Sequence, residues 1–221
     1  MHLRTVAAVA ALSAGLAAAS GCATAHFARV IGRDNIAAGV TVGGPFTDIG
    51  LPVKTPLPIA VGWAKLGTGD RTDAYMELGL TTLAFGRFLW GFGGVFQIVE
   101  QRGALPGIAG HAGITLLTDF REARFWPQLG LAASWKFGRA SLVYLGVDSF
   151  SELDPVRMRV APLVGAELRF TDNFAFTLEG KWYEPGYDAR DRAVPDYLSI
   201  AGHGALGVVL GISFYFDRDR P

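Results

Sequence analysis

GVVLGISFYFD, residues 207–217, lies just before the end of the chain and decides its fold class. Side chains of a β-strand alternate between two faces. Here one face is large and apolar, and the other is small or carries a hydroxyl group, apart from Val209. The apolar face consists of Val208, Leu210, Ile212, Phe214 and Phe216. The stretch therefore predicts a strand whose apolar face meets either a protein core or lipid.

The same alternation recurs along the chain, with Gly, Pro, Asp or Asn turns between the alternating segments. Lengths of about 9–14 residues match tilted strands that cross a membrane, whereas strands of soluble proteins centre on about 5–6 residues. Ten candidate strands lie approximately at 36–44, 57–66, 73–85, 87–99, 108–119, 124–137, 140–149, 157–170, 173–184 and 205–216.

The segment 124–137 shows which face meets which surroundings. Its bulky face includes Leu131 and Trp135, and its other face includes Ser134 and Lys136. Ten strands that point several large rings inward would crowd a narrow barrel, whereas a membrane barrel points them at lipid and lines its interior with small and polar groups. We therefore predict an all-β, antiparallel up-and-down transmembrane β-barrel of about ten strands, with eight or twelve as alternatives. A lipid-anchored soluble sandwich or lipocalin-like barrel is the other interpretation.

The glycines and aromatic rings agree with a membrane barrel. The chain has 29 glycines, many inside alternating segments, where they would make room in the interior. Aromatic rings near strand ends are typical of the interfacial girdles of such barrels. The predicted girdle residues are Phe88, Phe125, Trp135, Phe137, Phe170, Phe174, Trp182, Phe214 and Phe216.

The connections are predicted to be short at one end and long at the other, as in outer-membrane barrels. The long ones are 45–56, 150–156 and 185–204, and the short ones include GTGDR and TDN. The link near Gly86 is an exception at the long end, which a tight hairpin or a miscounted strand would explain.

The first residues indicate export. Arg4 precedes an uncharged run, Thr5–Ala19, which is too short to span a membrane and is typical of a secretory signal. The run ends at Ala19-Ser20-Gly21-Cys22, which resembles a bacterial lipobox and contains the only cysteine. This resemblance implies cleavage before Cys22, diacylglycerol and acyl groups on its thiol, and, with Ala23 next, sorting to the outer membrane. The predicted regions are a signal peptide at 1–21, a lipidated linker at 22–35 and a barrel at 36–221.

Three segments carry a resemblance to small OmpA-like and OmpW-like outer-membrane barrels of Gram-negative bacteria. GAELRFTDNFAFTLEGKWYEP (165–185) resembles their strand–turn–strand unit, and GTGDRTDAYMELGL (67–80) resembles a turn-and-strand unit of lipobox-bearing barrels. GISFYF, with Phe214 and Phe216, resembles the terminal signal for barrel assembly. The resemblance implies the outer membrane as location, with the N-terminus periplasmic and lipid-anchored. It implies as partners outer-membrane lipids, the barrel-assembly machinery and lipoprotein-processing enzymes.

Composition and motifs argue against several other classes. After removal of the signal, 19 basic and 20 acidic residues remain, so no positive surplus points to nucleic acid. No cysteine cluster, Gly-rich phosphate loop or His-x-x-x-His pair is present, and we expect no metal and no cofactor beyond the acyl groups. His26 is expected in a solvated linker and His111 in the lumen. Asp196, Ser199 and His203 share the longest loop, which leaves a lipid A-modifying enzyme as an alternative, but no catalysis is expected.

Charged side chains on the small face are predicted to form a network in the lumen, because opposite charges satisfy each other there. The alternative is a narrow polar conduit. We expect a structural or surface role, or narrow passage of small solutes; a lipid-tethered periplasmic barrel that binds a lipid is a further alternative. The predicted lumen charges are Glu77, Arg87, Lys136, Arg159, Glu167, Arg169, Glu179 and Lys181.

The lipobox resemblance leads to a direct test at Cys22. We expect Cys22→Ser to abolish incorporation of labelled palmitate and to leave the signal uncut by the lipoprotein peptidase, because no other thiol is available. The barrel should still reach the membrane, since its lipid-facing area far exceeds that of one anchor. Continued palmitate labelling of the serine variant would contradict the lipoprotein assignment.

Overall fold

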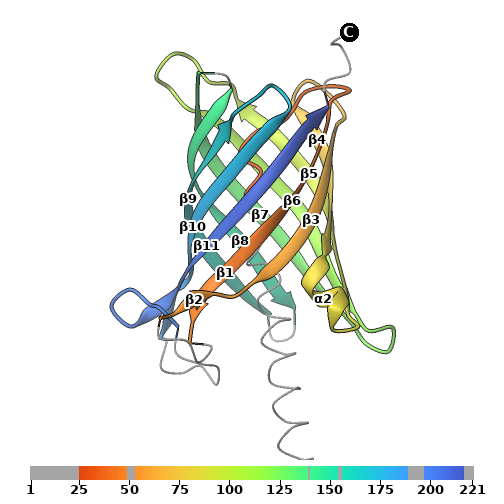
Figure 1. Ribbon diagram of the computed structural model, residues 1–221, viewed down its shortest axis with the longest axis vertical. Helices are drawn as coiled ribbons and strands as arrows, with labels where there is room; N and C mark the ends of the chain where they lie inside the picture. The colour runs from red at the N-terminus through yellow and green to blue at the C-terminus, as the bar shows by residue number, and fades with distance from the viewer. Residues whose placement is uncertain (1–24, 49–52, 139, 154–155, 189–196, 217–221) are drawn as a thin grey trace, which may run out of the picture.

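The computed structural model describes residues 25–48, 53–138, 140–153, 156–188 and 197–216. It is an antiparallel up-and-down barrel in which the long strands pair with their neighbours in the chain and the last pairs with the first (Figure 1). The ten long strands are β1 (Ile36–Thr47), β3 (Ile59–Gly67), β4 (Thr72–Gly79), β5 (Phe88–Val99), β6 (Gly107–Thr118), β7 (Ala123–Phe137), β8 (Ser141–Leu153), β9 (Val156–Arg169), β10 (Phe174–Asp188) and β11 (His203–Phe216).

The seam between β1 and β11 closes the sheet. It runs without a register break from Ile36 opposite Phe216 to Pro45 opposite Gly207. Closure leaves neither strand as a free edge, so its main-chain polar groups pair within the protein. The expectation of a ten-stranded, antiparallel, up-and-down barrel is confirmed.

Two short elements were not predicted. The strand β2 (Thr55–Pro56) pairs only with the end of β1. The prediction of a strand over 73–85 is wrong in its second half, because β4 ends at Gly79 and the helix α2 (Leu80–Ala84) follows. The hydroxyl group of Thr82 donates to the carbonyl of Gly79 at 2.8 Å, and Gly86, with φ of 71°, ends the turn after the helix. The link near Gly86 is therefore a helical connection, neither a tight hairpin nor a miscounted strand.

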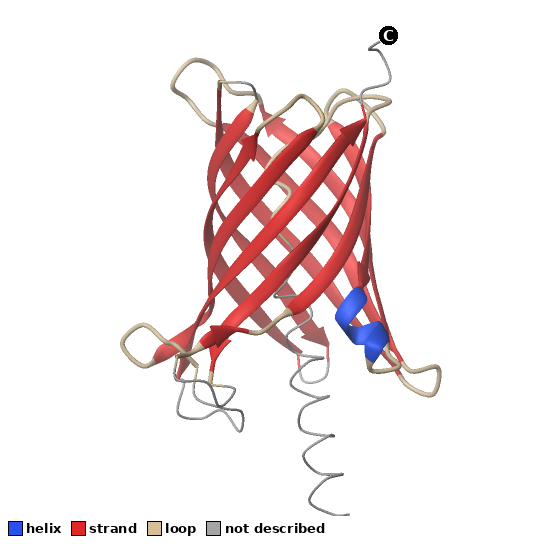
Figure 2. Cartoon of the chain, viewed as in Figure 1, coloured by secondary structure: helices blue, strands red, loops and turns tan. Residues whose placement is uncertain are grey.

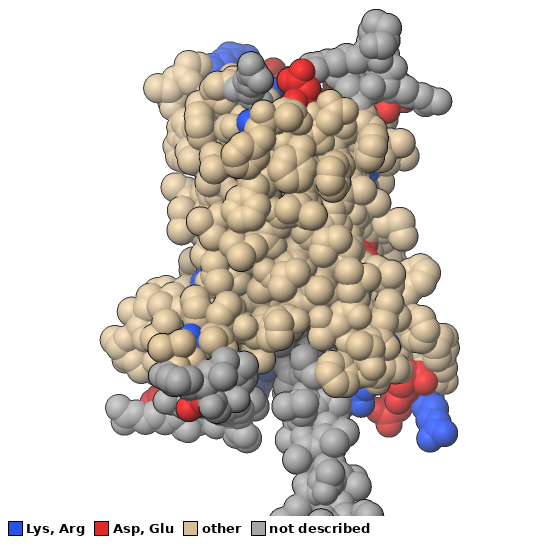
Figure 3. Space-filling model, viewed as in Figure 1, with Lys and Arg blue, Asp and Glu red and all other residues tan. Residues whose placement is uncertain are grey.

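The outer face of the barrel is apolar, as predicted. Charged side chains are sparse on the band between the two ends of the visible face and gather near the ends (Figure 3). This surface suits the hydrocarbon core of a membrane better than water. Exposed apolar residues on the strands include Met76, Trp90, Phe92, Phe96, Ile114, Leu129, Leu131, Leu145, Val164, Leu178, Leu210, Ile212, Phe214 and Phe216.

The inner face combines glycines with a few large rings. A Cβ atom at Gly165 would overlap the ring of Tyr144, and one at Gly130 would overlap the ring of His111. Tyr144 is buried, at 3% exposure. Glycine is therefore required at these strand positions because rings from neighbouring strands lie over them in the lumen.

The barrel has two different ends (Figure 2). The start of β1 and the end of β11 lie at one end, which we call the turn end. Its connections are 68–71, 100–106, 138–140 and 170–173. The opposite loop end holds α2, the connection 119–122 and residues 197–202. Among the described residues, no helix is long and apolar enough to cross a membrane.

A charge should be costly on the outer face at mid-height. Leu131 lies near the middle of β7 and is 47% exposed. We expect Leu131→Arg to reduce the stability of the folded barrel by about 2–4 kcal/mol, since the charge would lie in hydrocarbon. The yield of folded, heat-modifiable protein on a gel measures the effect.

Phe120→Arg is the matched control, because Phe120 is also a large exposed apolar residue, at 78%, but lies in the connection after β6. It should fold like the wild type. Equal tolerance of arginine at both positions would contradict a lipid-facing outer surface.

Candidate functional site: the barrel lumen

Residues 25–35, which we call the lumen segment, lie inside the barrel and lead from its middle to β1 at the turn end (Figure 1). Hydrogen bonds join this segment to strands on several sides of the wall. They link His26 to β8 and β10, Arg29 to β3 and β7, and Ile31 to β4. A segment that contacts walls on different sides of a closed sheet fills part of the lumen.

The placement corrects one prediction from the sequence. His26 was expected in a solvated linker, but it is buried, at 6% exposure. The expectation failed because the polar groups that surround His26 come from distant strands. Cys22 and the signal region lie outside the described residues.

The turn-end half of the segment is held by charged groups. The guanidinium of Arg29 donates to the hydroxyl and the carbonyl oxygens of Ser134, both at 2.8 Å. Lys65 donates to the carbonyl of Arg29 at 2.8 Å and pairs with Asp73 at 3.3 Å. Asp73 also accepts from the main-chain N–H of Ile31 at 2.9 Å. Lys65 and Asp73 are buried, so they pair with each other and with the main chain of Arg29 and Ile31 inside the lumen.

Apolar contacts add to this attachment. The ring centroid of Phe27 lies 4.9 Å from that of Tyr75 and 5.4 Å from that of Trp63. Ala28 belongs to a buried cluster with Ala132 and Tyr144. The lumen segment is therefore packed against the wall as a core would be, and not suspended in water.

A second set of charges surrounds His26 near the middle of the barrel. We call His26, His111, Asp148, Glu179 and Lys181 the central cluster. His26 Nδ1 lies 2.5 Å from Asp148 Oδ1, and the main-chain N–H of His26 donates to Glu179 at 2.9 Å. Lys181 Nζ donates to Asp148 Oδ2 at 2.8 Å and lies 3.1 Å from Glu179 Oε1. The side chains of Glu179 and Lys181 are 0% and 1% exposed, so this ion pair is shielded from water.

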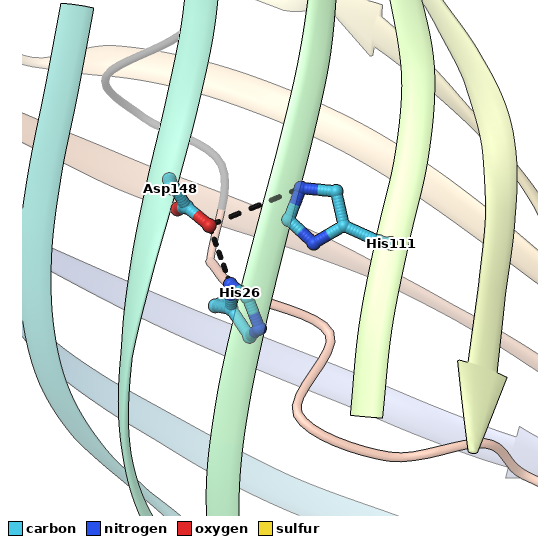
Figure 4. Close-up of side chains that lie close together, drawn as sticks. All are labelled: His26, His111 and Asp148. Carbon is cyan, nitrogen blue, oxygen red and sulfur yellow. Dashed lines mark hydrogen bonds and ion pairs between the residues drawn. The ribbon is translucent and has the colours of Figure 1, made fainter. Parts of the chain in front are cut away.

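His111 on β6 completes the central cluster (Figure 4). Its ring centroid lies 4.8 Å from that of His26, and its Nε2 lies 3.8 Å from Asp148 Oδ1. Gly130 on β7 leaves the space that both His111 and Asp148 occupy. Three elements distant in sequence, the lumen segment, β6 and β8, thus bring two imidazoles and a carboxylate together.

The described residues place the predicted lumen charges at several heights of the barrel. Glu179 and Lys181 belong to the central cluster, and Glu77 is buried on β4, at 4% exposure. Lys136, Glu167 and Arg169 line a cavity on the turn side, where Arg169 Nε lies 3.8 Å from Glu167.

The last two predicted charges lie toward the loop end. Arg159 pairs with Glu152 at 2.8 Å and with Glu184. Arg87 lies just before β5 and outside the strands. The eight predicted charges are therefore distributed along the height of the barrel, and the lumen network stays a prediction.

The list of lumen charges predicted from the sequence did not include Asp148, Lys65 and Asp73. The alternation contained a signal for Asp148 and Asp73. Asp148 shares a face with the buried Leu142 and Tyr144, and Asp73 shares one with Glu77. For the lumen segment the sequence offered no comparable signal, because residues 25–35 have no strand or helix period.

Two cavities remain beside the lumen segment. The larger, of about 230 Å³, lies on the turn side and is bordered by Lys65, Glu167, Arg169 and Tyr215. The guanidinium of Arg169 lies 3.7 Å from the ring centroid of Tyr215. The smaller cavity, of about 30 Å³, borders His26, His111 and Asp148. Both are smaller than the roughly 300–1,000 Å³ of ordinary small-molecule sites.

The loop residues considered for catalysis are not assembled into a site by the described residues. Asp196 lies outside them. Within 197–216, Ser199 and His203 share no hydrogen bond, and the main chain of His203 bonds to Ile200. Phe214 and Phe216, predicted as an assembly signal, lie on the exposed face of β11.

Comparisons with solved structures find distant matches, and the comparisons of sequence find none. No protein-family model matches the sequence, and a search of curated proteins finds no match. The translocator domain of the autotransporter NalP from Neisseria meningitidis is similar in structure, at 10% identity and a TM-score of 0.41, over 82% of this chain and 88% of that one. OprG of Pseudomonas aeruginosa matches at 10% identity and a TM-score of 0.29, over 86% of this chain and 99% of that one. Ail of Yersinia pestis matches at 11% identity and a TM-score of 0.28, over 83% of this chain and 99% of that one.

The buried ion pair of the central cluster provides a test of the lumen packing. We expect Lys181→Met to lower the free energy of unfolding by about 3–5 kcal/mol, because Asp148 and Glu179 would lose the ammonium group that satisfies them. Unfolding by denaturant in detergent micelles measures the change. Arg71→Met, which removes an exposed pair with Glu100, should cost at most about 1 kcal/mol. Equal effects of the two substitutions would contradict a shielded central cluster.

Proposed function

We propose that this protein is an outer-membrane β-barrel lipoprotein of a Gram-negative bacterium with a structural or surface role and no catalytic activity. In this proposal its lumen is closed by the chain itself. The observation that carries the proposal is the lumen segment, whose side chains and main chain bond to β3, β4, β7, β8 and β10. A segment attached at so many points resists displacement by a passing solute.

The size of the remaining space supports a closed lumen over an open conduit. The larger cavity, of about 230 Å³, is smaller than an ordinary small-molecule site, and the packed central cluster lies between it and the loop end. The ring of Phe27 also packs against Tyr75 and Trp63 inside the lumen. Passage of sugars is therefore not part of the proposed role.

The proposed location rests on the apolar outer face and on the asymmetry of the two ends. Outer-membrane barrels have short turns in the periplasm and longer loops outside, so we assign the turn end to the periplasm. The lipid anchor at Cys22 is a separate part of the proposal. Cys22 stands four positions before His26, and four extended residues reach at most about 14 Å. An acylated Cys22 therefore has to lie within about 14 Å of the buried His26.

Conductance across a planar lipid bilayer tests the closed lumen. We expect the wild type to show no steady conductance beyond that of small ions and no sugar uptake in a liposome-swelling assay. A variant in which residues 25–33 are replaced by a Gly/Ser chain of equal length should conduct more, because Phe27, Arg29 and their contacts are removed. Replacing 119–122 in the same way is the control, since that connection lies outside the barrel wall.

A large, steady wild-type conductance with sugar uptake would refute the closed lumen and favour a porin. Should the Gly/Ser variant fail to fold, the wild-type measurement alone still separates the two outcomes. Lipid A of altered mass after overexpression would contradict the absence of catalysis.

A further inference from the structure

The central cluster contains ring nitrogens that its hydrogen bonds do not use. Within the described residues, His26 Nε2 and His111 Nδ1 have no hydrogen-bond partner, although both atoms are buried. The side chain of His26 is 0% exposed and that of His111 is 10% exposed. His111 Nε2 faces Asp148 Oδ1 at 3.8 Å, which is too long for a hydrogen bond. A buried ring nitrogen without a partner is costly, and His111 lacks the bond to Asp148 that His26 makes through Nδ1, so the cluster is incomplete on the side of His111.

We propose that His26, His111 and Asp148 bind a divalent transition-metal ion, with zinc as the best match. One ligand atom from each residue lies within 4.8 Å of the other two. Zinc binds imidazole nitrogen and carboxylate oxygen at about 2.0–2.2 Å, which places ligand atoms about 3.3 Å apart around a tetrahedral ion. Asp148 Oδ1 lies 2.5 Å from His26 Nδ1 and 3.8 Å from His111 Nε2, on either side of that value, and these three atoms are the proposed ligands. Small rotations of the two rings would therefore complete the site.

The cluster has space for the ion and for one more ligand. The cavity of about 30 Å³ is bordered by all three residues and also by Gln128 and Glu77. Its volume exceeds the roughly 10–15 Å³ that a cavity needs to hold one water molecule. A water at the fourth position, facing this cavity, would leave the protein to supply three ligands.

The charges around the cluster favour a cation with two positive charges. The described residues that border the small cavity include two carboxylates, Glu77 and Asp148, and no lysine or arginine. Lys181 lies on the other side of Asp148 and bonds to Oδ2, and its own charge is balanced by Glu179. Oδ1 therefore stays directed at the imidazoles while Oδ2 is held, as ligating carboxylates usually are. Calcium and magnesium prefer sets of oxygen ligands and fit two imidazoles poorly.

The bound ion would connect parts of the chain that fold far apart. His26 belongs to the lumen segment, His111 to β6 and Asp148 to β8. The metal would therefore fasten the segment to two strands of the wall. This goes beyond the closed lumen and rests on it in one respect, since His26 has to lie in the lumen.

Metal binding is tested on the full chain in detergent after treatment with a chelator. We expect calorimetry with ZnCl₂ to show one ion per chain, and cobalt to give the visible absorption bands of a tetrahedral nitrogen–oxygen site. His111→Gln should weaken zinc binding at least tenfold, since changes even to groups behind the ligands cost about 10–100-fold. Calcium should not compete.

His203→Gln is the matched control, because His203 is exposed at the start of β11 and outside the cluster. It should bind zinc like the wild type. The proposal is overturned by a wild type that takes up no stoichiometric zinc, by equal affinity in His111→Gln, or by equal loss in His203→Gln. His111→Gln removes none of the hydrogen bonds that hold His26, which go to Asp148 and Glu179, so it tests the site while the lumen segment stays attached. Conductance reports on the closed lumen separately, so failure of one proposal is distinguishable from failure of the other.

Discussion

The closure of the sheet is the constraint on which the rest of the structure depends. A sheet surrounded by lipid has no water to satisfy a free strand edge, so β1 has to pair with β11. The width of a barrel grows with its number of strands, and ten strands leave a lumen that the side chains of the wall alone do not fill. Glycines such as Gly130 and Gly165 add space, because they place no side chain on the inner face. The space so created is filled by residues 25–35, which supply both apolar contacts and partners for charges.

Lumen charges and lumen segment depend on each other. Lys65, Asp73 and Glu179 are buried, and each of them bonds to a main-chain group of the segment. Buried charges are stable only when such partners are present, because their transfer from water is costly. The buried charges of the wall are therefore stabilised by the main chain of the segment, and the segment is held in place by those charges. This mutual satisfaction explains how a barrel with an apolar exterior can keep so many ionisable groups inside.

Much of the fold could be predicted because strand alternation is a local property. Phe214 and Leu131 were assigned outward from their own neighbours in sequence, and Glu179 and Lys181 inward in the same way. The helix after Gly79 was not foreseen, since Leu80–Ala84 continues the alternation and only the hydroxyl contact of Thr82 reveals the turn. The central cluster could not be predicted either. His26, His111 and Asp148 are far apart in sequence, and their meeting depends on strand register and on a segment without any period.

The position of the lumen segment next to β1 has a consequence for the order of assembly. Asn35 is followed directly by Ile36, which pairs with Phe216, 180 positions later in the chain. Contacts of such long range form slowly, because the intervening chain has to be ordered first. A segment that entered after the seam had formed would have to strip water from Arg29 and its partners inside a narrow tube. The faster route is for the segment to settle among the strands while the seam is open, so that zipping of β1 to β11 becomes the last step and traps the segment in place.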